Sequence, residues 1–200
     1  MKENTNLVQL NKKVNLKKAK GFLGEGFSRN ADFLSSVVSS LQLSKDSKVL
    51  DVGTGRGVMA IILALHGYNV ITGEPEGVYW ADWKSSAKKV GVEKLIKFQP
   101  VNAEKLTFSN DYFDAVFLYT TFHHINNKQR AIKELFRIIK PNSILVIIEL
   151  TDEGVELVRK RFRNHQDAVD PCDYTKDLKF EVEIIESKYL NAYIFKKQVE

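Results

Sequence analysis

A run of alternating glycines directly follows a short apolar stretch and an acidic residue. Residues 49–57 read V-L-D-V-G-T-G-R-G. Glycine at this spacing lets the backbone turn sharply and lets a ligand approach the main chain closely. The spacing G-x-G-x-G departs from the dinucleotide fingerprint G-x-G-x-x-G, because Val58 stands where the third glycine would fall. The pattern predicts a ligand-binding turn, and the acid before it disfavours the alternative of a tight turn with a structural role alone.

A second acidic residue, Glu74, comes 21 residues after Gly53, behind the apolar residues of a predicted strand. A carboxylate at that position can accept two hydrogen bonds from the vicinal hydroxyls of a ribose. The alternatives are a solvated turn acid before Pro75, or a ligand role for Glu76 if the register differs by two residues.

His123 and His124 follow another apolar stretch and are candidates for proton transfer near neutral pH. The alternative is a structural pair that hydrogen-bonds its loop and shapes a pocket. The only cysteine, Cys172, can form neither an internal disulfide nor a cysteine-based zinc site. The sequence assigns no metal ligands.

Apolar periodicity predicts alternating strands and helices around these residues. Strands are expected at 48–52, 69–72, 96–101, 114–119 and 144–150, and helices at 31–41, 58–66, 77–90, 129–139 and 151–165. Two closely spaced strands, at 180–184 and 189–195, follow. Glycines at positions 21, 24 and 26 argue against a stable helix there. The alternation predicts an α/β fold with a mainly parallel sheet, helices on both faces and the last two strands at one edge.

Composition and charge favour one folded domain, at residues 30–200, behind a basic N-terminal arm at residues 1–29. The 200 residues are 44% apolar and 28% charged, which excludes a mainly disordered chain. Neither a run of about 20 apolar residues nor an apolar signal core occurs, so we expect a soluble cytoplasmic protein without membrane insertion. The arm's lysines could contact phosphate or an acidic partner, or form a solvated tail. Phe22 and Phe27 make this segment a candidate lid.

In the order and spacing of four segments, the chain resembles the class I S-adenosylmethionine-dependent methyltransferases, notably the group similar to ubiquinone- and menaquinone-biosynthesis methyltransferases. The segments are L-D-V-G-T-G-R-G at 50–57, I-T-G-E-P at 71–75, N-A-E-K-L-T-F-S-N-D-Y-F-D-A-V-F at 102–117, and F-H-H-I at 122–125 with E-L-F-R-I-I-K-P at 134–141. The resemblance covers about residues 30–150. It implies a Rossmann-like, seven-stranded, mostly parallel sheet with an antiparallel edge hairpin.

The resemblance also implies a cofactor site for S-adenosylmethionine. In that site Asp51 orders the turn and helps to position the methionine ammonium, and Gly53, Thr54, Gly55 and Gly57 form the floor under methionine and ribose. Glu74 takes the ribose hydroxyls, while Pro75, Asn102 and Ala103 lie near the adenine and the main chain of Tyr119 near the methionine end. Asn102 stands where many relatives have Asp, which removes a charge but keeps an acceptor. Asn142 replaces a glycine of a later turn and tolerates its left-handed backbone.

The function that the resemblance implies is methyl transfer to an unidentified acceptor, with His123 and His124 as the candidate catalytic residues. We expect a small-molecule acceptor, and a protein or RNA substrate stays open. An Asn-Pro-Pro-Tyr-like tetrad, typical of amino-group methyltransferases acting on DNA bases and glutamine, does not follow Tyr119. Two rivals stay open: a non-catalytic S-adenosylmethionine-binding regulatory or scaffold protein, and a nicotinamide-dependent oxidoreductase. The oligomeric state is not predicted.

Overall fold

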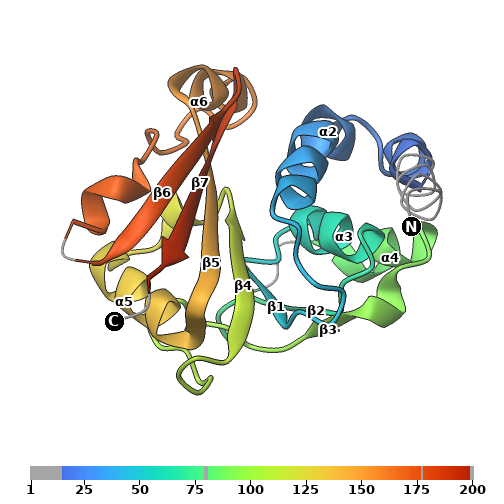
Figure 1. The fold of residues 1–200 in the computed structure, drawn as a ribbon. Helices are drawn as coiled ribbons and strands as arrows, with labels where there is room; N and C mark the ends of the chain where they lie inside the picture. Colours follow the sequence, from blue (N-terminus) through green and yellow to red (C-terminus); the bar gives the residue numbers. More distant parts are fainter. Residues whose placement is uncertain (1–14, 79–80, 177, 199–200) are drawn as a thin grey trace.

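The computed structural model describes residues 15–78, 81–176 and 178–198, and its centre is a seven-stranded sheet. The strand order is β3-β2-β1-β4-β5-β7-β6, with parallel pairing from β3 to β5 and antiparallel pairing of β7 with both neighbours. The strands are Val49–Val52 (β1), Val70–Gly73 (β2), Ile96–Phe98 (β3), Phe113–Tyr119 (β4), Ile139–Leu150 (β5), Phe180–Glu186 (β6) and Leu190–Lys197 (β7). The predicted α/β sheet with its antiparallel edge hairpin is confirmed (Figure 1).

Helices cover both faces of this sheet. The helices are Glu25–Ser40 (α2), Val58–Leu65 (α3), Trp83–Lys89 (α4), Lys128–Ile138 (α5) and Asp152–Arg159 (α6), with 3-10 turns at Glu93–Leu95 (η1), Phe122–His124 (η2) and Pro171–Tyr174 (η3). Figure 1 shows α2, α3 and α4 on one side of the sheet and α5 on the other. Among the residues described, no helix is long and apolar enough to cross a bilayer.

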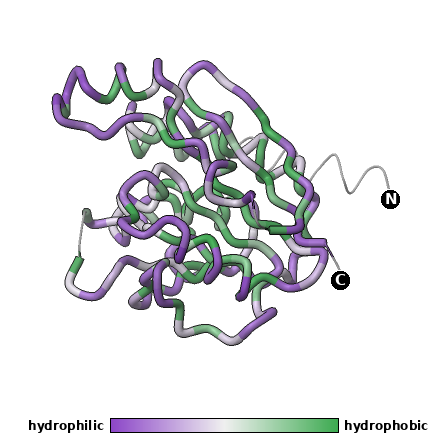
Figure 2. The backbone as a smooth tube through the Cα atoms, turned by 90° about the vertical axis from the view of Figure 1, so that its left-hand side faces the viewer, coloured by the Kyte–Doolittle hydropathy of each residue, from purple (hydrophilic) through white to green (hydrophobic). Residues whose placement is uncertain are grey.

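Alternate residues of the central strands divide the core into two apolar layers. Phe117 of β4 packs on the layer that contains α2 and α3, whereas its neighbours Val116 and Leu118 pack on the layer that contains α5. This follows from the two-residue period of a strand, whose successive side chains point to opposite faces. Figure 2 shows green, hydrophobic stretches of the backbone towards the middle of the molecule and many purple, hydrophilic stretches at its periphery. A strand apolar on both faces is what a doubly covered sheet requires.

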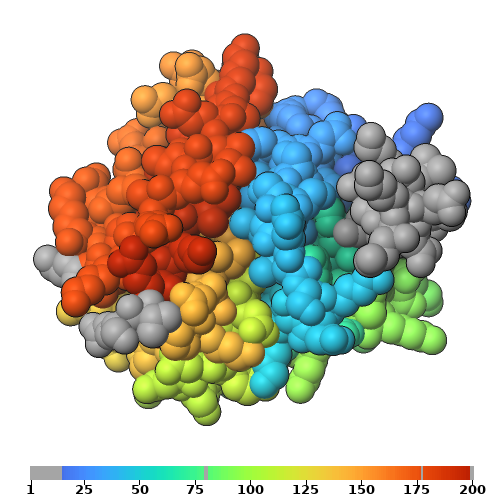
Figure 3. Space-filling model, in the orientation of Figure 1, coloured from blue at the N-terminus to red at the C-terminus, as the bar shows by residue number. Residues whose placement is uncertain are grey.

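The N-terminal and C-terminal parts of the described chain meet on one face of the molecule. Figure 3 shows α2, in blue, beside the last strands, in orange and red. Leu41 and Leu43, just after α2, belong to the same apolar cluster as Ile194 of β7. Burial of these side chains therefore ties α2 to the hairpin that closes the sheet.

The expectation that glycines 21–26 would prevent a helix is wrong. Residues 15–23 are helical, and α2 begins at Glu25, six residues before its predicted start. Only Gly24, with φ 76°, interrupts the two helical segments. Ala19 and Phe27 are buried against the core, so tertiary packing offsets the helix-propensity cost of glycine. Residues 1–14 of the predicted basic arm lie outside the described residues, whereas residues 15–29 belong to these two helical segments and the Gly24 break between them.

Two helices are shorter than predicted, one because it begins later and the other because it ends earlier. The helix predicted at 77–90 begins at Trp83, where the Asp82 carboxylate accepts a hydrogen bond from Ser85 N at 2.9 Å. The helix predicted at 151–165 ends at Arg159. Strand β5 starts at Ile139 rather than 144, and Asn142 adopts φ 61°, as predicted for this turn.

Candidate functional site

The residues predicted to bind a ligand meet where the parallel strands end. Gly53 N donates to Gly73 O at 2.9 Å, which joins the turn after β1 to the end of β2. Val101 N donates to Glu74 O at 2.8 Å, which brings the segment after β3 to the same edge. The carboxyl ends of neighbouring parallel strands are where open α/β sheets bind ligands.

The three glycines of the turn differ in what an added side chain would contact. Gly53, Gly55 and Gly57 all have positive φ, at 88°, 49° and 77°. A Cβ on Gly53 would lie 2.2 Å from Thr121 Oγ1, and one on Gly57 would lie 2.8 Å from Trp83 Cβ. A Cβ on Gly55 would meet no atom of the described chain within 4 Å. Two glycines are therefore required by packing, whereas Gly55 faces open space that a ligand can use.

Asp51 is a fully buried carboxylate at the end of β1. Its Oδ2 accepts a hydrogen bond from Thr72 Oγ1 at 2.8 Å, and the Thr54 and Thr72 hydroxyls are also 2.8 Å apart. Since Thr72 gives its one proton to Asp51, Thr54 donates to Thr72. Asp51 Oδ1 has no hydrogen-bond partner among the described residues. Burial raises the Asp51 pKa from 3.8 to about 7, against the lowering effect of Thr72.

Glu74 closes over the glycine turn from the end of β2. Its Oε1 accepts a hydrogen bond from Gly55 N at 2.6 Å. Burial raises the Glu74 pKa, and the hydrogen bond from Gly55 acts in the opposite direction. The structure thus brings Glu74 to the turn as predicted, with Pro75 exposed beside it. It gives Glu76 no comparable contact within the described residues.

The segment after β3 is close by, but its polar side chain has a local partner. Asn102 is exposed, and its Oδ1 accepts a hydrogen bond from Glu104 N at 2.9 Å. The amide oxygen assigned to an adenine amino group therefore closes a turn of its own chain. Ala103 is buried next to it.

Tyr119 joins the end of β4 to α2. Its hydroxyl accepts a hydrogen bond from Asn30 Nδ2 at 2.7 Å, and burial raises its pKa. Asn30 lies within α2 and donates across to the sheet. The side chain of Tyr119 is thus structural here, which leaves its main chain for the predicted ligand role.

The two predicted histidines lie in η2, directly after β4. His123 is buried, with Nδ1 2.6 Å from Oε2 of the equally buried Glu149. The other oxygen of Glu149 accepts hydrogen bonds from Phe122 N at 2.7 Å and His123 N at 3.3 Å. His124 lies beside it with ring centroids 4.0 Å apart. Burial, then the neighbouring His123 and His165, lower the His124 pKa to about 4, so that this ring is neutral at pH 7.

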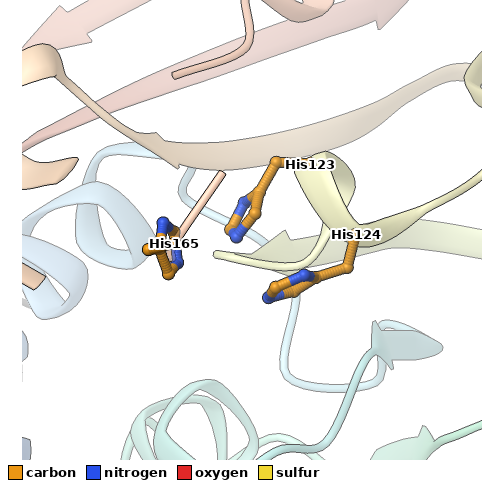
Figure 4. Close-up of side chains that lie close together, drawn as sticks. All are labelled: His123, His124 and His165. Carbon is orange, nitrogen blue, oxygen red and sulfur yellow. The ribbon is translucent and has the colours of Figure 1, made fainter. Parts of the chain in front are cut away.

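Several residues of this region were not foreseen, and the signals for them differ. Glu149 could have been noticed as the one charged side chain within the apolar run at 144–150. Thr72 and Thr121 have no distinctive local pattern. His165 lies 4.9 Å from His123 between ring centroids, although the two are 42 positions apart in the chain. Only the fold brings it to the pair (Figure 4).

Comparison with known sequences finds similarity to methyltransferases. The family model described as "Methyltransferase domain" matches residues 50–147, about half of the chain. A ubiquinone/menaquinone biosynthesis C-methyltransferase, UbiE, of Vibrio parahaemolyticus is 28% identical over 121 residues. That match covers 56% of this chain and 45% of the relative, so the chain spans less than half the length of the protein it matches.

Solved structures agree on the fold. A SAM-dependent methyltransferase of Aquifex aeolicus superimposes with a TM-score of 0.62 at 20% identity, covering 82% of this chain and 88% of that one. The [4+2]-cyclase SpnF superimposes with a TM-score of 0.67 at 19% identity, covering 84% of this chain and 82% of that one. At these identities the likeness concerns the Rossmann-like fold alone, and one fold can carry different chemistries.

Proposed function

Because residues 50–147 form a methyltransferase domain of the class I, S-adenosylmethionine-dependent family, we propose that this protein transfers a methyl group from S-adenosylmethionine to a small-molecule acceptor. The observation that carries the proposal is the buried Oδ1 of Asp51, which has no hydrogen-bond partner among the described residues. The other oxygen of Asp51 is linked through Thr72 to Thr54, the residue before Gly55, where the chain leaves open space. A buried acceptor without a donor is costly, and a ligand that supplies the donor removes that cost.

The residues present fit this cofactor. Its ammonium group can donate to Asp51 Oδ1 and would favour the ionised carboxylate, whose pKa is otherwise raised by burial. Its ribose hydroxyls can reach Glu74, a carboxylate that is held at the turn by Gly55 N. The missing Cβ at Gly55 leaves room for the ligand against the main chain.

The cofactor supplies a sulfonium-bound methyl group. The chain's own residues bind and orient the cofactor and the acceptor, and they exclude water from the site. Asp51 and Glu74 would fix the methionine and the ribose of the cofactor, which holds the reacting carbon in one place. The packed pair Gly53 and Thr121 joins this turn to the loop that carries His123 and His124. That loop would face the acceptor, so cofactor and acceptor would be aligned by two loops in direct contact.

A small organic acceptor is supported by the relatives, whose printed name places them in ubiquinone and menaquinone biosynthesis. His123 is the better-positioned candidate to take a proton from such an acceptor, since Glu149 orients its ring. A protein or RNA acceptor would be an alternative outcome of the tests below. The cytoplasmic location stays a prediction from the sequence.

Calorimetric titration with S-adenosylmethionine, S-adenosylhomocysteine and NADH tests the cofactor assignment. We expect binding of the first two and none of NADH. Gly55→Val should abolish this binding, because the new side chain enters the ligand's space, where a Cβ meets no atom of the described chain within 4 Å. Gly67→Val is a matched control, because Gly67 also has positive φ and open surroundings but lies beyond the far end of α3, about 12 Å away. Equal binding by both variants would refute the placement of the site.

Turnover is tested separately by following S-adenosylhomocysteine formation with panels of phenols, quinols, amines and thiols, and with protein and RNA. Product formation with a small molecule supports the proposal. Tight cofactor binding without turnover on any acceptor would favour the non-catalytic rival. Binding of NADH alone would favour the oxidoreductase rival.

A further inference from the structure

Three of the four histidines of the chain gather at one point beside the end of β4. One ring nitrogen from each of His123, His124 and His165 lies within 4.8 Å of the other two. Two of these residues come from η2 and the third from the loop after α6 (Figure 4). Histidine is the commonest metal ligand in proteins, and three nitrogen donors are enough for a zinc site with an open position.

Polar contacts hold both segments that carry the histidines. Lys128 Nζ donates to the carbonyl oxygens of His123 and Ile125, at 3.1 and 2.8 Å, which fixes η2. The guanidinium of Arg159 donates twice to His165 O, at 3.0 and 2.7 Å, and forms an ion pair with Asp167. Hydrogen bonds therefore fix the backbone of both segments that carry the three histidines.

The ring hydrogen bonds leave nitrogen lone pairs available at the centre of the cluster. Glu149 can only accept, so Nδ1 of His123 donates to it and the neutral ring keeps its lone pair on Nε2. That Nε2 is buried and has no hydrogen-bond partner among the described residues. Nδ1 of His165 likewise lies 2.9 Å from Gln166 O, a carbonyl that can only accept. A histidine that donates one nitrogen to a carboxylate and offers the other is the usual arrangement around a metal ion.

We propose that His123, His124 and His165 bind a Zn²⁺ ion, with Glu149 orienting His123. Imidazole nitrogens suit Zn²⁺ and other late divalent metals rather than Mg²⁺ or Ca²⁺. Tetrahedral bonds of about 2.1 Å place nitrogen ligands about 3.4 Å apart. The exposed His124 and the partly exposed His165 can close the remaining distance by side-chain rotation, while His123 stays fixed.

Three protein ligands leave one position of the ion for water or an acceptor oxygen. In that position the ion would lower the pKa of an acceptor hydroxyl, so that its proton passes to solvent. The oxygen would then form a bond to the cofactor's methyl carbon while the carbon–sulfur bond breaks, and S-adenosylhomocysteine would leave. This role rests on the proposed function, whereas metal binding itself does not. The same Nε2 of His123 cannot bind the ion and accept a proton, so the ion would take over the role predicted for His123 as a base.

Titration of the metal-free protein with Co²⁺, followed by visible absorption, tests the site directly, and Zn²⁺ should displace the Co²⁺. We expect one Co²⁺ per chain, with affinity lowered roughly tenfold or more in His124→Ala and in His165→Ala. Both side chains are at least partly exposed, so both variants should fold. Cys172→Ser removes the only thiol and should bind Co²⁺ like the wild type. Absence of a stoichiometric site, or Co²⁺ affinity equal to that of the wild type in either histidine variant, would overturn the proposal.

Glu149→Gln tests the positioning role. We expect Co²⁺ affinity to fall about 10–100-fold while S-adenosylmethionine affinity is unchanged. A merely structural role would lower both affinities or neither. S-adenosylmethionine titration of the histidine variants also separates the two proposals, since loss of metal binding with intact cofactor binding concerns the metal site alone.

Discussion

Replacing Asp51 by Asn should change how the stability of the protein depends on pH. Asp51 is fully buried, and its pKa is raised from 3.8 to about 7 by that burial. A group whose pKa is higher in the folded state binds more protons there, so it stabilises the fold at low pH. The stabilisation is complete below pH 3.8 and is lost as the pH rises to about 7.

The size of the effect follows from the shift. About three pH units at 1.36 kcal/mol each correspond to roughly 4 kcal/mol in total, of which about 3 kcal/mol is lost between pH 5 and pH 8. Asn has the same shape as Asp and can still accept the hydrogen bond from Thr72, but it does not ionise. The variant should therefore be less sensitive to pH than the wild type.

Urea denaturation of both proteins at pH 5, 6, 7 and 8 measures this difference. We expect the free energy of unfolding of Asp51→Asn, relative to the wild type, to rise by about 3 kcal/mol across the range. Other titrating groups, including Glu74, are present in both proteins and largely cancel. If the two stability profiles ran parallel, the reasoning on Asp51 would be refuted.

The same substitution should act in the opposite direction on ligand binding. Asn cannot provide a negative charge for the cofactor's ammonium group, so S-adenosylmethionine should bind at least tenfold more weakly at pH 8. A more stable protein with weaker binding would identify Asp51 as a residue kept for function at a cost in stability. Unchanged affinity would remove Asp51 from the binding site.

Three further substitutions test the packing that positions the site, each by urea denaturation against the wild type. Gly53→Ala places a methyl group 2.2 Å from Thr121 Oγ1 at φ 88°, and should cost about 2–4 kcal/mol, a value that Gly55→Ala should not reach. Tyr119→Phe removes the hydrogen bond from Asn30 and should cost about 1 kcal/mol; no loss would mean that this bond contributes nothing to stability. Phe117→Ala empties a fully buried position of β4 and should cost about 3–5 kcal/mol, and a loss under 1 kcal/mol would contradict the core described above.

The central fold could be predicted from the sequence because its signals are local. Apolar runs of strand length, the glycine turn at 53–57 and the glycine at position 67 mark β1 and α3 to within a residue. Element ends were less predictable where tertiary contacts oppose local preference. Helix α2 begins before its predicted start because Phe27 is buried, although glycines precede and interrupt that segment.

In the candidate site too, some features could be predicted from local sequence and others could not. The types and order of Asp51, Gly55 and Glu74 were sufficient to predict a glycine turn with a nearby carboxylate, because turn geometry and strand ends depend on a few consecutive residues. The contact between Glu74 and Gly55 N agrees with that prediction. The engagement of Asn102 by Glu104 is a short-range contact that the resemblance to relatives obscured.

The sequence by itself determined the α/β alternation, the glycine turn and the residue types of the site, since these depend on local periodicity and backbone chemistry. Only the tertiary structure decided that His165 joins His123 and His124, and that Glu149 holds His123. Such contacts join residues about 25–40 positions apart, so they arise from how helices and strands pack. The raised pKa of Asp51 likewise depends on the burial that packing produces, which no pattern of neighbouring residues contains.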